Sequence, residues 1–122
     1  MRTVTKRELQ KAAMGAAIEA MPRLKAEATR SIAERSPARL AVVVDGLLRG
    51  ALYGPTSTGL RKHATVFEIS PADAAAMIVE KICDAANNAV FGAGTDHDTK
   101  PYVSAVDDVR KAALQKLRGG NG

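Results

Sequence analysis

The sequence contains no tryptophan, only two tyrosines and two phenylalanines, and a single cysteine, Cys83, among its 122 residues. One cysteine cannot form a disulfide within the chain, which indicates a reducing compartment, and we expect a cytoplasmic protein. Long hydrophobic runs are absent too. The most apolar stretch, residues 40–52, contains Asp45 and Arg49 and is shorter than the roughly 20 residues of a membrane-spanning helix. Residues 1–10 lack the apolar region of a signal peptide, so we expect no membrane association.

Motifs that would identify a catalytic mechanism are also missing. The sequence has no Gly-x-Ser-x-Gly, His-Glu-x-x-His or Cys-x-x-Cys pattern. The segment from Gly54 to Gly59 superficially resembles a phosphate-binding loop, but Leu60 and Arg61 stand where that motif requires Lys and then Ser or Thr. We therefore expect a non-enzymatic protein that needs no cofactor.

What the chain does have is apolar content, 46% of its residues, with alanine the commonest of them. This composition predicts one mostly helical domain, residues 1–118, built from four to five helices and followed by a disordered tail, residues 119–122. Alanine fills little space, so either the helices approach one another closely or a second subunit completes the core. We expect a homo-oligomer.

Capping residues and apolar periodicity predict where the helices lie. They are expected over about 5–35, 36–54, 70–92 and 104–118, each opening at a Ser or Thr cap. In the first helix, Thr5 and Glu8 form a capping box, and Pro22 either bends the helix or divides it in two. The second helix is the most apolar, and we expect it at the centre of the core.

Residues 64–69 are rich in Thr, Val, Phe and Ile, which favours one short strand. A lone strand needs a partner. The best internal candidate is Tyr102–Val103, and the alternative is the same strand of a second subunit.

The whole positive excess of the chain lies in its first third. Through Leu40 there are nine basic and four acidic residues, whereas the remainder has nine of each. A basic stripe opposite the alanine-rich face of the first helix would suit the phosphate backbone of nucleic acid, or an acidic protein surface. Its members would be Arg7, Lys11, Arg23, Lys25, Arg30 and Arg35.

Glutamates are interleaved with these basic residues, so a solvated, salt-bridged helix is the alternative. The spacing of surface ion pairs occurs at Glu8–Lys11, Glu19–Arg23 and Glu27–Arg30. The scarcity of aromatic residues also argues against stacking on the bases of single strands.

Two segments, 54–63 and 92–102, suggest a different ligand. Each combines hydroxyls, a cation, an imidazole and an aromatic ring, which together could hold a nucleotide-like small molecule. The candidate residues are Tyr53, Arg61, Lys62, His63, His97, Lys100 and Tyr102. Solvated turns would account for the same composition. Asp96, His97 and Asp98 are adjacent, and neighbouring residues rarely converge on one ion, so we predict no metal site.

These observations leave three hypotheses for function. The leading one is a homo-oligomeric helical protein whose basic N-terminal helix contacts nucleic acid. The second is a protein–protein adaptor or inhibitor that docks through the alanine-rich face of that helix. The third is a binder of a nucleotide-like small molecule at segments 54–63 and 92–102.

Overall fold

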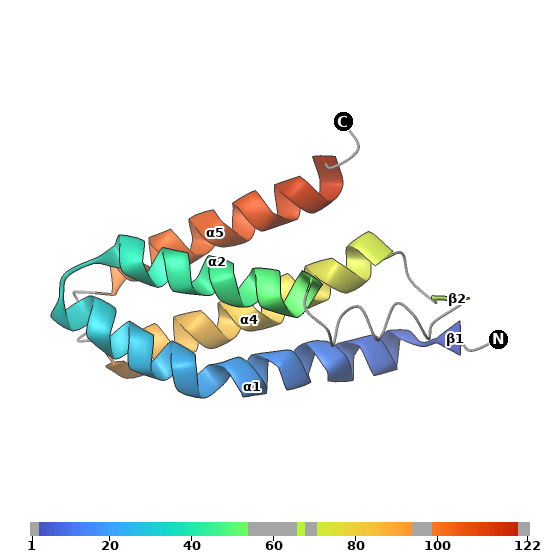
Figure 1. Ribbon diagram of the computed structural model, residues 1–122, viewed down its shortest axis with the longest axis horizontal. Helices are drawn as coiled ribbons and strands as arrows, with labels where there is room; N and C mark the ends of the chain where they lie inside the picture. The colour runs from blue at the N-terminus through green and yellow to red at the C-terminus, as the bar shows by residue number, and fades with distance from the viewer. Residues whose placement is uncertain (1–2, 54–65, 68–70, 94–98, 120–122) are drawn as a thin grey trace.

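The computed structural model describes residues 3–53, 66–67, 71–93 and 99–119. They form the helices α1 (Lys6–Ala33), α2 (Pro37–Tyr53), α4 (Pro71–Ala93) and α5 (Lys100–Gly119), and the strands β1 (Thr3–Val4) and β2 (Val66–Phe67). The prediction of a small, mostly helical fold is confirmed. Figure 1 shows that the helices alternate in direction, so that α1 and α4 run one way and α2 and α5 return.

The first two helices begin at the caps that the sequence predicts. The backbone N–H of Glu8 donates to the Thr5 hydroxyl at 3.1 Å, and that of Arg39 donates to the Ser36 hydroxyl at 3.3 Å. Pro22 does not divide α1, which is one continuous helix from Lys6 to Ala33. Its axis bends about midway along its length (Figure 1), so the first of the two alternatives for this segment holds.

A strand forms within segment 64–69, at the described residues Val66–Phe67, and its partner is not the one expected. β2 pairs in parallel with β1, with Thr3 opposite Val66 and Val4 opposite Phe67. The pairing lies within one chain, at the end of the bundle where α1 and α4 begin (Figure 1).

The proposed partner strand, Tyr102–Val103, was wrong because these residues are helical. α5 begins at Lys100 and not at Ser104. The carbonyl of Thr99 accepts the N–H groups of Tyr102 and Val103, at 3.1 and 2.9 Å, which closes the first turn. A proline is tolerated in the first turn of a helix, so Pro101 does not prevent this earlier start.

The core lies between the four helices and uses many small side chains. Buried alanines occur on α1 at Ala13, Ala17, Ala20 and Ala28, and on α4 at Ala75, Ala85, Ala86 and Ala89. α1 makes its most extensive contact with α4, as expected when small side chains let two helices approach closely. The alanine-rich face of α1 is therefore covered by the chain itself.

α4, and not α2 as expected, supplies the largest share of the buried core. α2 buries Leu40, Val44, Leu48 and Leu52 along a single face. α4 packs against α1 on one side and α5 on another, so it is buried over a wider arc that includes Val79, Ile82 and Val90.

Candidate functional site

The basic residues of α1 do not form one stripe. A helix turns by about 100° per residue, which places Arg7, Lys11 and Lys25 along one edge of α1. The same geometry places Arg23 and Arg30 along the other edge, across the buried face. The positive charge predicted for a single stripe is thus divided between two sides of the helix.

The two edges of α1 also differ in their ion pairs. The Arg30 Nε lies 3.4 Å from the Glu34 carboxylate. Glu27, its expected partner, pairs instead with Arg39 of α2, at 3.1 Å. Within the described residues, neither the expected Glu19–Arg23 pair nor the expected Glu8–Lys11 pair is formed. Arg35 lies exposed in the turn between α1 and α2, with a φ of 53°.

The edge that carries Arg7, Lys11 and Lys25 is exposed and unpaired. None of their three side chains has an ion-pair or hydrogen-bond partner among the residues that the structure describes. Between them lie Met14 and Ile18, which are 52% and 63% exposed. We refer to these five residues as the outer face of α1. The glutamates of α1 fall on its other edge, so the outer face combines three positive charges with two apolar side chains.

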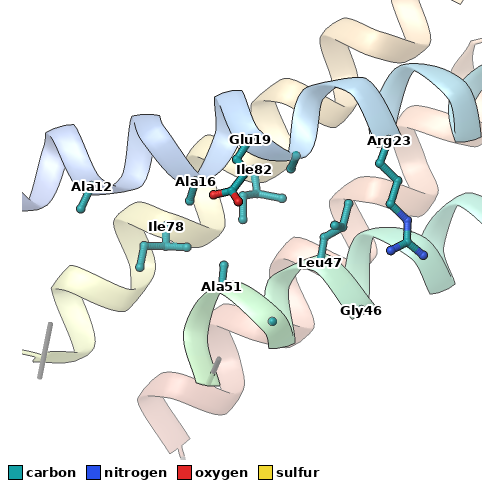
Figure 2. Close-up of a pocket in the computed structure, with 11 residues that line it drawn as sticks. Ala12, Ala16, Glu19, Arg23, Gly46, Leu47, Ala51, Ile78 and Ile82 are labelled. Atoms are coloured by element: carbon teal, nitrogen blue, oxygen red, sulfur yellow. The ribbon is translucent and has the colours of Figure 1, made fainter. Parts of the chain in front are cut away.

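On its other side α1 borders a groove of about 430 Å³ that also involves α2 and α4 (Figure 2). It is lined by the small residues Ala12, Ala16, Gly46 and Gly50 and by the larger apolar residues Leu47, Ile78 and Ile82. Glu19 and Arg23 also line it. Figure 2 shows the Glu19 carboxylate turned toward Ile82 and the Arg23 guanidinium directed toward α2.

Neither charged group of the groove has an ion-pair or hydrogen-bond partner within the described ranges. Sequence reasoning missed this groove entirely. The available signal was the four-residue spacing of small residues, at Ala12 and Ala16 on α1 and at Gly46 and Gly50 on α2. That spacing puts a row of small side chains on one side of each helix.

Most of the small-molecule site predicted from the sequence falls outside the residues that the structure describes. Outside the described residues lie Arg61, Lys62, His63 and His97, together with the side chain of Tyr53. Lys100 is exposed at the start of α5. Tyr102 is only 5% exposed, and its hydroxyl donates to the Ser31 carbonyl at 3.3 Å, so its ring packs in the core and is not presented to a ligand. The remainder of this hypothesis stays a prediction.

The buried thiol of Cys83 lies beside an ion-pair cluster. Burial raises the pKa of the Cys83 thiol from 9.0 to about 12, and the nearby Glu80 carboxylate raises it as well. The guanidinium of Arg110, on α5, forms two ion pairs: its Nη1 lies 3.1 Å from Glu80 Oε1, and its Nη2 lies 2.8 Å from Asp107 Oδ1. Hydrogen bonds from Arg110 and Lys111 hold the pKa of Asp107 below its usual value. This cluster joins α4 to α5. Burial keeps the thiol protonated, which is the opposite of an activated nucleophile.

Metal binding and membrane insertion find no support in the described part of the chain. No three His, Cys, Asp or Glu side chains there are placed to hold a metal ion, and the segment Asp96–Asp98 lies outside it. No helix there is both long enough and apolar enough to cross a bilayer.

Comparison with known proteins adds no relative. No family model matches the chain, and no curated protein or solved structure is detectably similar to it.

Proposed function

We propose that the chain is a non-enzymatic helical interaction protein that binds the phosphate backbone of nucleic acid through the outer face of α1. The observation that carries this proposal is the set of three exposed cations, Arg7, Lys11 and Lys25, on one edge of one helix. None of them is neutralised by a carboxylate of the described residues. The lone, buried Cys83 supports a reducing, cytoplasmic setting for this activity.

The spacing of the cations suits backbone contacts more than base readout. Arg7 and Lys25 are 18 residues apart, or about 27 Å along the helix axis at 1.5 Å per residue. Duplex DNA carries about one negative charge per 1.7 Å of its axis, so a helix of this length passes many phosphates. Such contacts position a protein without reading sequence, and we expect little sequence preference.

The test is a fluorescence-anisotropy titration with labelled duplex DNA over a series of salt concentrations. Three phosphate contacts release about three counterions, which corresponds to a slope of log K against log salt of about −2.7. The variant Arg7→Gln/Lys11→Gln/Lys25→Gln should lose most of the affinity and nearly all of that slope. Far-UV circular dichroism should be unchanged, because all three side chains are exposed.

A matched control removes the same charge from cations that already have partners. Arg30, Arg49 and Lys111 are each paired with a carboxylate within one turn. The variant Arg30→Gln/Arg49→Gln/Lys111→Gln should therefore keep most of the affinity and slope. Equal losses in both variants would show that only net charge matters, and no binding by the wild-type chain at low salt would overturn the proposal.

Met14 and Ile18 favour a second candidate, an adaptor function, because phosphate contacts make no use of an exposed apolar pair. The alanine-rich face that the sequence offered for docking is buried, so an adaptor would have to use another surface. An acidic amphipathic helix would match the outer face, with carboxylates near its cations and apolar residues over Met14 and Ile18. Displacement of labelled DNA by such a peptide, but not by a neutral one, would support this reading.

A further inference from the structure

Two apolar features on opposite sides of α1 are left unexplained by phosphate binding. The first is the pair Met14 and Ile18, which lie one turn apart and are more than half exposed. Single exposed apolar side chains are ordinary, but two adjacent large ones on one helical face form a small ridge. The second feature is the groove between α1, α2 and α4, whose sides are built from small residues.

The groove has the size and lining to receive such a ridge. Its volume of about 430 Å³ is within the range of about 300–1,000 Å³ that is typical of binding pockets. Gly46 and Gly50 lie one turn apart on α2, and Ala12 and Ala16 lie one turn apart on α1. The spaces beside these small residues therefore have the same spacing along a helix as the two side chains of the ridge. A Cβ atom placed on either glycine would meet nothing within 4 Å.

Charge adds to this match in shape. Glu19 lines the groove and Lys11 lies one turn before Met14, and neither has an ion-pair partner among the described residues. If the ridge of one copy entered the groove of another with Lys11 toward Glu19, these two oppositely charged side chains would form an ion pair. Arg23, at the other end of the groove, is directed toward α2 and away from Glu19 (Figure 2).

The two features cannot meet within one chain. Met14 is two residues from both Ala12 and Ala16, and two residues turn a helix by about 200°. The ridge and the groove therefore point in nearly opposite directions. When the ridge of one copy binds the groove of another, the first copy keeps a free groove and the second keeps a free ridge. Such a contact between two different surfaces is a head-to-tail contact.

We propose that Met14 and Ile18 of one copy insert into the groove between α1, α2 and α4 of the next, so that the chain assembles head to tail. The ridge and the groove match in residue spacing, in apolar character and in the one charge pair of Lys11 with Glu19. Every copy of the chain carries both features, so each groove has a ridge available from another copy. The contact uses Lys11 of the outer face and therefore competes with nucleic acid for it, but the inference does not rest on nucleic-acid binding and is tested without nucleic acid.

The experiment uses two variants that block opposite ends of the contact. Met14→Gln/Ile18→Gln removes the ridge and keeps the cations of the outer face. Gly46→Leu/Gly50→Leu fills the groove at two positions where an added Cβ atom has nothing within 4 Å. Sedimentation velocity should show a mass that rises with concentration for the wild type and a monomer for each variant alone.

Mixing the two variants is the decisive step. The groove-filled variant keeps its ridge and the ridge-less variant keeps its groove, so an equimolar mixture should form a one-to-one dimer and stop there. A wild type that is monomeric at every concentration would overturn the second copy as occupant and leave the groove to another partner. Self-association that survives in either variant, or a mixture that stays monomeric while the wild type associates, would overturn the head-to-tail contact.

Folding is checked separately from assembly. Gly46→Ala/Gly50→Ala should raise the midpoint of urea unfolding of the monomer, because alanine is favoured over glycine in a helix interior. This variant fills less of the groove and should still associate, although more weakly than the wild type. If the leucine variant proved unfolded by circular dichroism, the graded series Gly, Ala and Val at residue 50 would provide the same comparison.

Discussion

At the scale of single residues, one carbonyl accounts for the burial of Tyr102. The Ser31 carbonyl accepts the Ser36 N–H at 2.9 Å and the Tyr102 hydroxyl at 3.3 Å, which ties the end of α1 to the start of α5. A buried tyrosine hydroxyl needs such a partner. The sequence gives no sign of this contact because its two residues are 71 positions apart. The Ser31 hydroxyl itself is buried and finds no partner in the described structure.

Cys83 shows most directly how burial controls chemistry. Its side chain is fully buried, and its pKa of about 12 leaves only about one thiol in ten thousand ionised at pH 8. We predict that a disulfide reagent reacts with Cys83 slowly in native buffer and rapidly in guanidinium chloride, because the thiolate is the reacting species. Absorbance of the released thiolate measures both rates.

A surface thiol provides the control for this measurement. Ser104 is exposed on α5, so Ser104→Cys in a Cys83→Ala background should react quickly under native conditions. If native Cys83 reacted as fast as that control, the packing of α4 against its neighbours would not be as the structure describes it.

At the scale of elements, capping chemistry was predictable and long-range packing was not. Thr5 and Ser36 act within three residues of themselves, so their sequence signals suffice. The start of α5 was misplaced because Ser104 is a good cap, whereas the cap that forms uses Thr99 in front of Pro101. Segment 64–69 was recognised as extended, but its partner β1 lies at the start of the chain and has only two residues. Nothing local identifies so short a strand.

The candidate site was predictable only in part, for the same reason. The residues of the outer face could be found from charge and helical spacing, but their separation from Arg23 and Arg30 depends on which face of α1 is buried. The groove combines residues from three helices, and its position follows from how those helices pack. The spacing of small residues marks a helix surface to which another helix can pack closely, but it does not identify that second helix.

Pro22 tests whether the bend in α1 is needed or merely tolerated. Proline donates no N–H, so the Ile18 carbonyl loses its helical partner, and an interior proline is about 3 kcal/mol less favourable than alanine. We predict that Pro22→Ala raises the free energy of unfolding by about 1–3 kcal/mol, since Pro22 is exposed and its replacement removes no core contact. Urea denaturation should show a higher midpoint at an unchanged m-value.

The exposed position Gln10 provides a reference for this change. Gln10→Ala, on the same helix, should alter stability by less than about 0.5 kcal/mol. An unchanged or lower stability of Pro22→Ala would show that the bend is required for α1 to follow α4 along its length.

At the scale of the whole molecule, the described elements fall into two similar halves. The first is β1, α1 and α2, and the second is β2, α4 and α5, so each is a strand followed by two antiparallel helices (Figure 1). The contact of α1 with α4 is the largest between them, α2 also packs against both α4 and α5, and β1 pairs with β2. Because α1 contacts α4 far more extensively than it contacts α2, the main interface of the molecule lies between the halves and not within either one.

This arrangement predicts that neither half folds alone, as a single domain over residues 1–118 requires. In a fragment of residues 1–60, the buried face of α1, including Ala13, Ala17 and Leu24, would lose α4 and be exposed to water. The contact of α1 with α2 is too small to offset the conformational entropy of ordering both helices.

The fragments 1–60 and 61–122 should each show weak helical circular dichroism, and their mixture should regain the signal of the full chain. A second fragment carrying Val79→Asp, which places a charge at a fully buried site of α4, should not restore it. Full helicity in either fragment alone would mean that the halves are independent domains that happen to pack together, and that neither depends on the α1–α4 interface for its folding.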